Sequence, residues 1–284
     1  MSHRPIKNFF QETHHPLLKS SELNWISSGD LLSKIAARSE TSLNAQKPKA
    51  IIFDLDSTLF CTATRLKSIL IRYIASHSTD HAAMDPAWIK LAHQLESIHQ
   101  NYSVPATLFQ MMKRFHPEDQ AKSLVKEFWP GFEEYWKEEF FLSRNMTVDP
   151  PYEGSVEFVK KTVEMGYSPI YLTGRDYGRG MDGTKHALRR WDYPLGSHSH
   201  TILKPDRAMK DMDFKQGVAQ VLNSRFDVHF VIDNEPENLA MFAVKIPSSE
   251  IVFFHSIMSH RWSAPDLKAD LSGRKILGLK SFAD

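Results

Sequence analysis

Apolar positions along the chain follow two periods, one typical of strands and one typical of helices. Short β-branched and aromatic runs, which indicate buried strands, occur at about residues 50–54, 168–173, 200–203, 228–232 and 251–254. Helical spacing separates the later runs, with helices expected at about 154–165 and 213–223. Strands that alternate with helices predict an α/β fold with a doubly wound parallel sheet and right-handed crossovers.

The stretch between the first two predicted strands shows helical periodicity alone. Its apolar residues recur every three or four positions from Leu66 to Ile74 and again from Trp88 to Leu95. Aromatic residues crowd positions 128–141, and we interpret most of them as core of this insert. We therefore expect three parts: a lead-in at 1–48 with a helix at about 30–39, packed on the core; an α/β core at 49–60 and 147–284; and an all-helical insert at 61–146.

Composition excludes several classes of protein without selecting one. The chain has 284 residues with 42% hydrophobic and 24% charged positions, as is typical of soluble globular proteins. Because 35 Lys and Arg balance 34 Asp and Glu, no overall field favours nucleic acid or a membrane as partner. The single cysteine, Cys61, fits a reducing cytoplasm, and we expect neither a signal peptide nor a transmembrane helix. The sequence carries no signal for an oligomeric state.

Two acids stand directly after the first predicted strand. Residues 51–60 read Ile-Ile-Phe-Asp-Leu-Asp-Ser-Thr-Leu-Phe, with Asp54 and Asp56 at the strand's C-terminal end. Residues i and i+2 of an extended chain point the same way, so both carboxylates can face one site. Unpaired buried charge is costly, which predicts a metal-assisted site where one carboxylate attacks and the other moves protons.

Two further strand ends carry polar residues that would converge on these acids. One reads Thr173-Gly174-Arg175-Asp176 and the other begins at Asp233 with Asn234 and Glu237 behind it. Ligands of open α/β sheets bind at the C-terminal ends of the strands. The chain resembles the haloacid dehalogenase-like (HAD) hydrolase superfamily, whose motifs match an Asp-x-Asp-x-Thr strand end, a strand ending in Thr, and a strand ending in an acid with another close behind.

This resemblance implies a separate role for each acid. Asp54 would attack phosphorus and form an aspartyl-phosphate. Asp56 would protonate the leaving alkoxide and then activate the water that hydrolyses the intermediate. A Mg²⁺ ion would be held by the Asp54 carboxylate, the Asp56 backbone carbonyl and Asp233, with water and phosphate completing its coordination.

The net charge of the predicted site supports a bound metal ion. Asp54, Asp56 and Asp233 contribute −3 and one lysine +1, so a phosphate dianion would meet a site of net charge −2. A contact between like unit charges at about 4 Å costs on the order of 4 kcal/mol at an effective dielectric near 20. Without a dication this site should therefore not bind phosphate.

The resemblance also implies a phosphate-binding set of Thr173, Gly174 and a lysine, with the Thr173 Oγ and nearby backbone N–H groups as donors. Two lysines are candidates for the lysine of this set. Lys204 stands in Leu-Lys-Pro after a predicted strand, and Lys215 ends Asp-Met-Asp-Phe-Lys at the start of a helix. We favour Lys215, because family members with a similar Asp-x-x-Phe/Tyr-Lys pattern place the active lysine there.

The sequence leaves the roles of three polar residues open. Arg175 either touches phosphate or has a structural role, and we favour a pair with Asp176 or another structural role. Glu237 and Asn234 are alternative supports for the fourth motif.

The resemblance implies a Mg²⁺-dependent phosphohydrolase that cleaves a phosphate monoester of a small soluble metabolite through an aspartyl-phosphate. Asp56 favours a phosphatase because the dehalogenase branch lacks this acid. The helical insert is similar to the mobile cap of family members that act on small metabolites. The alternatives are a phosphatase for nucleic-acid or nucleotide ends and a non-catalytic phosphate-binding or partner-binding module.

Overall fold

The computed structural model describes residues 4–8, 16–41, 46–77, 86–94, 105–258, 271 and 273–284. The chain divides into two compact units. Unit 1 comprises Met1–Cys61 and Pro150–Asp284, and unit 2 comprises Thr62–Asp149. The helical insert was predicted at 61–146.

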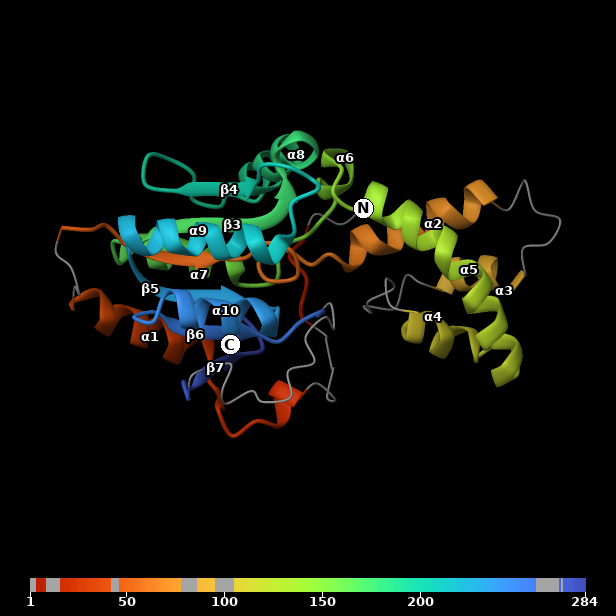
Figure 1. The fold of residues 1–284 in the computed structure, drawn as a ribbon, viewed down its shortest axis with the longest axis horizontal. Helices are drawn as coiled ribbons and strands as arrows, with labels where there is room; N and C mark the ends of the chain where they lie inside the picture. The colour runs from red at the N-terminus through yellow and green to blue at the C-terminus, as the bar shows by residue number, and fades with distance from the viewer. Residues whose placement is uncertain are drawn as a thin grey trace. The chain divides into compact units, whose positions relative to one another are not determined.

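Unit 1 is built on a sheet of seven parallel strands in the order β1-β7-β6-β5-β2-β3-β4 (Figure 1). The strands are β1 (Leu23–Trp25), β2 (Lys49–Phe53), β3 (Ser168–Asp176), β4 (His200–Lys204), β5 (Asp227–Asp233), β6 (Glu250–Phe254) and β7 (Ile276–Leu279). The predicted parallel sheet is confirmed, and the five strand predictions agree with β2 to β6 to within three residues.

The sequence analysis missed the two short strands at one edge of the sheet. In β1, Trp25 pairs with Gly278 of β7. A side chain at Gly278 would meet the Trp25 ring, because a Cβ there would lie 2.6 Å from Trp25 Cε3. The glycine that weakens the strand pattern of β7 is thus the residue that lets β1 approach.

The helices of unit 1 cover both faces of the sheet. They are the 3-10 helix η1 (Pro16–Lys19), α1 (Ser28–Ser39), α7 (Ser155–Glu164), α8 (Tyr177–Arg190), α9 (Asp211–Arg225) and α10 (Pro236–Lys245). The chain steps from β2 through β3 to β4 and then crosses back to β5 and β6. Right-handed crossovers therefore place α7 and α8 on one face, and α9 and α10, which pack against each other, on the other (Figure 1).

The core of unit 1 lies on both sides of β2, which is buried from its second residue onward. Ile51, Ile52 and Phe53 are almost fully buried, as expected for a central parallel strand. Because β3 and β5 flank β2 and the connections lead away from it in opposite directions, its C-terminal end is the topological switch point where such sheets bind ligands.

The described residues of unit 2 form helices joined by turns. Its helices are α2 (Ala63–His77), α3 (Pro86–Gln94), α4 (Pro105–Met112), α5 (Glu118–Glu139) and α6 (Ser143–Met146). Most aromatic residues of 128–141 belong to its core as predicted; for example, Phe128 stacks on Trp88 with ring centroids 3.9 Å apart. Arg65 and Asp149 form a fully buried ion pair at 2.6 Å. Among the residues that the structure describes, no helix is long and apolar enough to cross a membrane.

Candidate active site

Asp54 follows β2 directly and lies at the C-terminal edge of the sheet. Its backbone N–H donates to Ile232 O of β5 at 3.0 Å, so the ladder continues one residue beyond the strand. The side chain is buried. Burial raises the pKa of the Asp54 carboxyl well above its ordinary value; Lys215 opposes this shift and the like charge of Asp233 adds to it.

A tight turn over residues 55–60 sets the position of Asp56. The Leu55 carbonyl accepts hydrogen bonds from the backbone N–H groups of residues 58–60, at 3.3, 3.1 and 2.9 Å. Ser57 takes a left-handed conformation with φ 63°, which is uncommon for a residue with a side chain. Its backbone N–H donates to Phe60 O at 2.8 Å, and the Ser256 hydroxyl donates to its carbonyl. Hydrogen bonds from the backbone and from the Ser256 side chain therefore hold the turn in this conformation.

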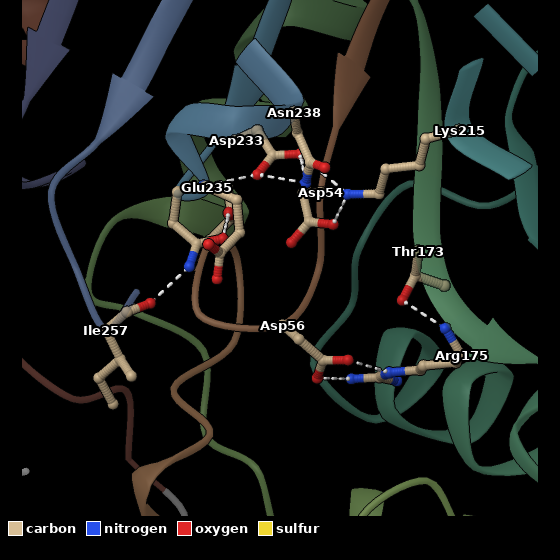
Figure 2. Close-up of polar contacts among 11 residues, drawn as sticks. Asp54, Asp56, Thr173, Arg175, Lys215, Asp233, Glu235, Asn238 and Ile257 are labelled. Carbon is tan, nitrogen blue, oxygen red and sulfur yellow. Dashed lines mark hydrogen bonds and ion pairs between the residues drawn. The ribbon is translucent and has the colours of Figure 1, made fainter. Parts of the chain in front are cut away.

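Lys215 joins the first and fourth predicted motifs. Its ammonium donates to Asp54 Oδ1 at 2.7 Å and to Asp233 Oδ2 at 2.9 Å (Figure 2). All three side chains are less than a tenth exposed. Burial alone would lower the pKa of Lys215, but the two carboxylates outweigh it and raise this pKa above its ordinary value. The lysine is therefore held charged between the two acids.

Asp233, the last residue of β5, is held by more donors than Lys215 alone. Glu235 N donates to its Oδ1 at 2.8 Å, and Asn238 Nδ2 lies 2.9 Å from its Oδ2 (Figure 2). Sequence reasoning considered Glu237 and Asn234 here and missed Asn238. The usable signal was position: α10 begins at Pro236, and a polar residue in its first turn can face the preceding strand end.

The two open candidates behind Asp233 have different surroundings. Asn234 accepts a hydrogen bond from Thr58 Oγ at 3.0 Å and donates to Ile257 O at 2.5 Å, so it supports the turn that carries Asp56. For Glu237, no side-chain hydrogen bond or ion pair is found among the residues that the structure describes.

Arg175 pairs with Asp56, which corrects the prediction of a pair with Asp176. Its Nε lies 3.0 Å from Asp56 Oδ2 and its Nη2 lies 2.8 Å from Oδ1, a two-pronged contact (Figure 2). Asp176 instead caps α8 by accepting from Arg179 N at 3.0 Å and pairs with the Arg179 side chain. Successive residues of a strand point to opposite faces, so Arg175 and Asp176 face different surroundings.

Lys204, the other motif lysine, lies outside this arrangement. It donates to Asp211 Oδ1 at 2.7 Å. The same carboxylate packs on Gly174, where a Cβ would come within 2.7 Å of Asp211 Oδ2, so a side chain there would displace Asp211. Thr173 is buried at the end of β3, and its Oγ accepts from Arg175 N at 3.3 Å. In the described part of the chain, no hydrogen bond joins Thr173 to the three acids.

The donor set fits a hard divalent cation. The buried Asp54 and Asp233 share one ammonium, and no hydrogen bond from a described residue reaches Asp54 Oδ2. Among those residues, no three His, Cys, Asp or Glu side chains form a metal site by themselves. Mg²⁺ binds through one or two carboxylates and completes its coordination with water and phosphate, so Asp54 and Asp233 are the side chains that would hold it.

Comparison with known proteins gave matches to solved structures alone. No family model and no curated protein sequence matches the chain. Matching structures include a HAD-superfamily hydrolase from Ehrlichia chaffeensis, with 15% identity, 83% of this chain and 93% of that chain covered, and a TM-score of 0.44. A HAD-family hydrolase from Deinococcus radiodurans with bound phosphate and sodium has 16% identity, coverage of 81% and 90%, and a TM-score of 0.40. A dehalogenase with an intermediate complex has 15% identity, coverage of 84% and 95%, and a TM-score of 0.44.

The fold and the site define the class of protein. Unit 1 is a doubly wound α/β core of the Rossmann-like type, with its acids at the C-terminal ends of central strands. Because the identities and TM-scores of the matched structures are low, these structures assign no activity to this chain, and its chemistry is argued from its own site.

Proposed function

We propose that the chain is a Mg²⁺-dependent phosphohydrolase that cleaves a phosphate monoester of a small soluble metabolite through an aspartyl-phosphate. One observation carries the proposal: the Lys215 ammonium bridges Asp54 and Asp233 at the switch point of the sheet. A lysine held between a potential nucleophile and a potential metal ligand supplies positive charge where a phosphoryl group would react.

In this mechanism Asp54 attacks phosphorus while Lys215 stabilises the negative charge that builds up on the phosphoryl oxygens. Asp56 gives a proton to the departing ester oxygen and later takes one from the hydrolytic water. Asp54, Asp233 and the Asp56 backbone carbonyl would hold Mg²⁺, which would neutralise phosphate charge. Thr173 Oγ and backbone N–H groups near Gly174 would bind the remaining phosphate oxygens.

Substitution of the nucleophile tests this proposal. We expect Asp54→Asn to abolish Mg²⁺-dependent release of phosphate across a panel of phosphorylated metabolites, with binding of Lys215 largely retained by the amide oxygen. Asp211→Asn is the matched control, because it alters the acid bound to the other lysine. Acid-quenched wild-type protein should carry a hydroxylamine-sensitive phosphate on the peptide that contains Asp54. Activity that survives Asp54→Asn would refute the mechanism.

The alternative substrates are the phosphorylated ends of nucleic acids or nucleotides. Lys and Arg nearly equal Asp and Glu in number, which favours small substrates, because binding to polynucleotide ends relies on a basic surface and weakens steeply with salt. A preference for oligonucleotide ends that falls steeply with salt would favour this alternative. Correctly folded protein that turns over no phosphate ester in Mg²⁺ would favour a binding module.

A further inference from the structure

Arg175 is anchored at all three of its guanidinium nitrogens. Two of them form the fork on Asp56, and the third, Nη1, donates to Thr184 Oγ of α8 at 2.9 Å. The Arg175 side chain is only 1% exposed, whereas Asp56 is 20% exposed. A buried planar group thus holds a carboxylate that is itself partly exposed; Figure 2 shows the two-pronged contact.

The burial of Arg175 alone does not explain this contact. Asp176 is the neighbouring acid in sequence and is also buried, but its carboxylate is bound to Arg179 Nε at 2.8 Å and caps α8. The structure therefore contains two separate arginine–aspartate pairs from one strand end. The first pair, Arg175 with Asp56, holds the acid two residues after Asp54. The second pair, Arg179 with Asp176, lies at the N-terminus of α8.

We propose that Arg175 is the positioning residue for Asp56 and fixes the direction in which Asp56 exchanges protons. This inference rests on the proposed function and deepens it. In the first step, Asp54 forms a bond to phosphorus, the bond from phosphorus to the ester oxygen breaks, and that oxygen leaves with the electron pair. It takes the proton of the Asp56 carboxyl. In the second step, the Asp56 carboxylate takes a proton from water as the water oxygen attacks phosphorus and releases Asp54.

The fork fixes the plane of the Asp56 carboxylate. Each carboxylate oxygen has two lone pairs, and each accepts one hydrogen bond of the fork. A side chain fixed in this way delivers its proton along one direction, and small errors in such placement reduce rates strongly.

Dependence on the leaving group tests this role. We would compare Arg175→Lys, which keeps the charge but loses the fork, with Arg179→Lys as the matched control. Each variant of the full chain is assayed with Mg²⁺ on an alkyl phosphate, whose leaving oxygen needs a proton, and on a nitrophenyl phosphate, whose leaving group departs as an anion. The constant to compare is kcat/KM, since it covers the steps up to release of the alcohol.

For Arg175→Lys we expect kcat/KM to fall about 100-fold on the alkyl ester and less than about 5-fold on the aryl ester, since general acid catalysis contributes on the order of 100-fold or more. Arg179→Lys should change both values by less than about 3-fold. In an Asp56→Asn background, Arg175→Lys should cause no further loss on the alkyl ester, because the arginine acts through the acid that has been removed.

The outcomes separate this inference from the proposed function. A wild-type protein inactive on both esters would overturn the function itself. An active wild type whose Arg175→Lys variant loses both activities equally, with losses that add to those of Asp56→Asn, would overturn the inference alone. If Arg175→Lys does not fold, Thr184→Val releases one anchor while keeping the arginine; it should shift the alkyl-to-aryl ratio in the same direction, and an unchanged ratio would count against the inference.

Discussion

Replacement of Lys215 by Met should cost both stability and activity, and replacement of Lys204 should cost little of either. The Lys215 ammonium contacts two buried carboxylates, at 2.7 and 2.9 Å, whereas Lys204 contacts one carboxylate, at 2.7 Å, that is 28% exposed. Methionine keeps much of the side-chain volume in both variants, so the comparison isolates the charge.

The expected loss of stability follows from the groups that stay behind. Removal of one partner from a buried ion pair costs about 3–5 kcal/mol. Asp233 would keep the hydrogen bonds from Glu235 N and Asn238, and Asp54, whose pKa burial already raises, could take up a proton. We therefore expect a loss near the lower end, about 3 kcal/mol, for Lys215→Met, and about 1 kcal/mol or less for Lys204→Met.

The pH dependence of this loss has a defined sign. In the unfolded chain Asp54 ionises near its ordinary pKa, about 3.9, whereas in the folded chain burial raises its pKa. Above the unfolded pKa the folded state binds more protons than the unfolded state, so stability falls as pH rises through the folded pKa. Without Lys215 the pKa of Asp54 in the folded chain should rise further, so this fall should extend to higher pH.

Urea unfolding in EDTA at several pH values measures these stabilities, and kcat/KM with Mg²⁺ measures activity. We expect Lys215→Met to lose about 100- to 1,000-fold in kcat/KM, the scale found when one preorganised donor to a developing negative charge is removed. Lys204→Met should lose less than about 3-fold. A larger activity loss from Lys204→Met, or equal losses of stability, would refute the assignment of Lys215.

Two further sets of substitutions test the stability of a buried ion pair in unit 2 and of a turn in unit 1. In unit 2, Asp149→Leu should lower the free energy of unfolding by about 3–5 kcal/mol, because it removes the carboxylate that pairs with the buried Arg65 charge. Urea unfolding should show at least half of this loss recovered in the double variant Arg65→Met/Asp149→Leu. No recovery would contradict the reasoning. In the turn after Asp54, Ser57→Val should be less stable than Ser57→Gly by about 1–2 kcal/mol, because φ is 63° there. Equal melting temperatures for the two Ser57 variants would count against strain at this residue.

The apolar pattern was enough to place the central strands but not every element. β2, β3, β5 and β6 each contain a short apolar run, as expected for parallel strands that are buried on both faces, whereas the edge strand β4 has a weaker one. α8 escaped assignment because its sequence contains Gly178, Gly180 and Gly183, which are weak helix formers. Its helix is stabilised by the Asp176 cap and by packing that buries two of these glycines, and such tertiary contacts are not visible in local propensity.

The candidate site divides in the same way between what a sequence pattern specifies and what packing decides. The rule that parallel strands converge at their C-terminal ends placed Asp54 near Asp233 without a structure. The partner of Arg175 depends on how the turn at 55–60 carries Asp56 toward β3, and no spacing rule encodes that path. The alternation of side chains along a strand did argue against an Arg175–Asp176 pair, since neighbours point to opposite faces.

The Arg175–Asp56 pair changes the charge argument for the metal. The count of −3 from the acids and +1 from one lysine omitted Arg175, and with it the site has net charge −1 before phosphate binds. The excess is not spread evenly, because Arg175 neutralises Asp56, while Asp54 and Asp233 share Lys215. If a phosphate dianion binds here as proposed, the dication that offsets its charge belongs beside Asp54 and Asp233. In the same proposed mechanism Asp56, which is paired with its own arginine, is left to the transfer of protons.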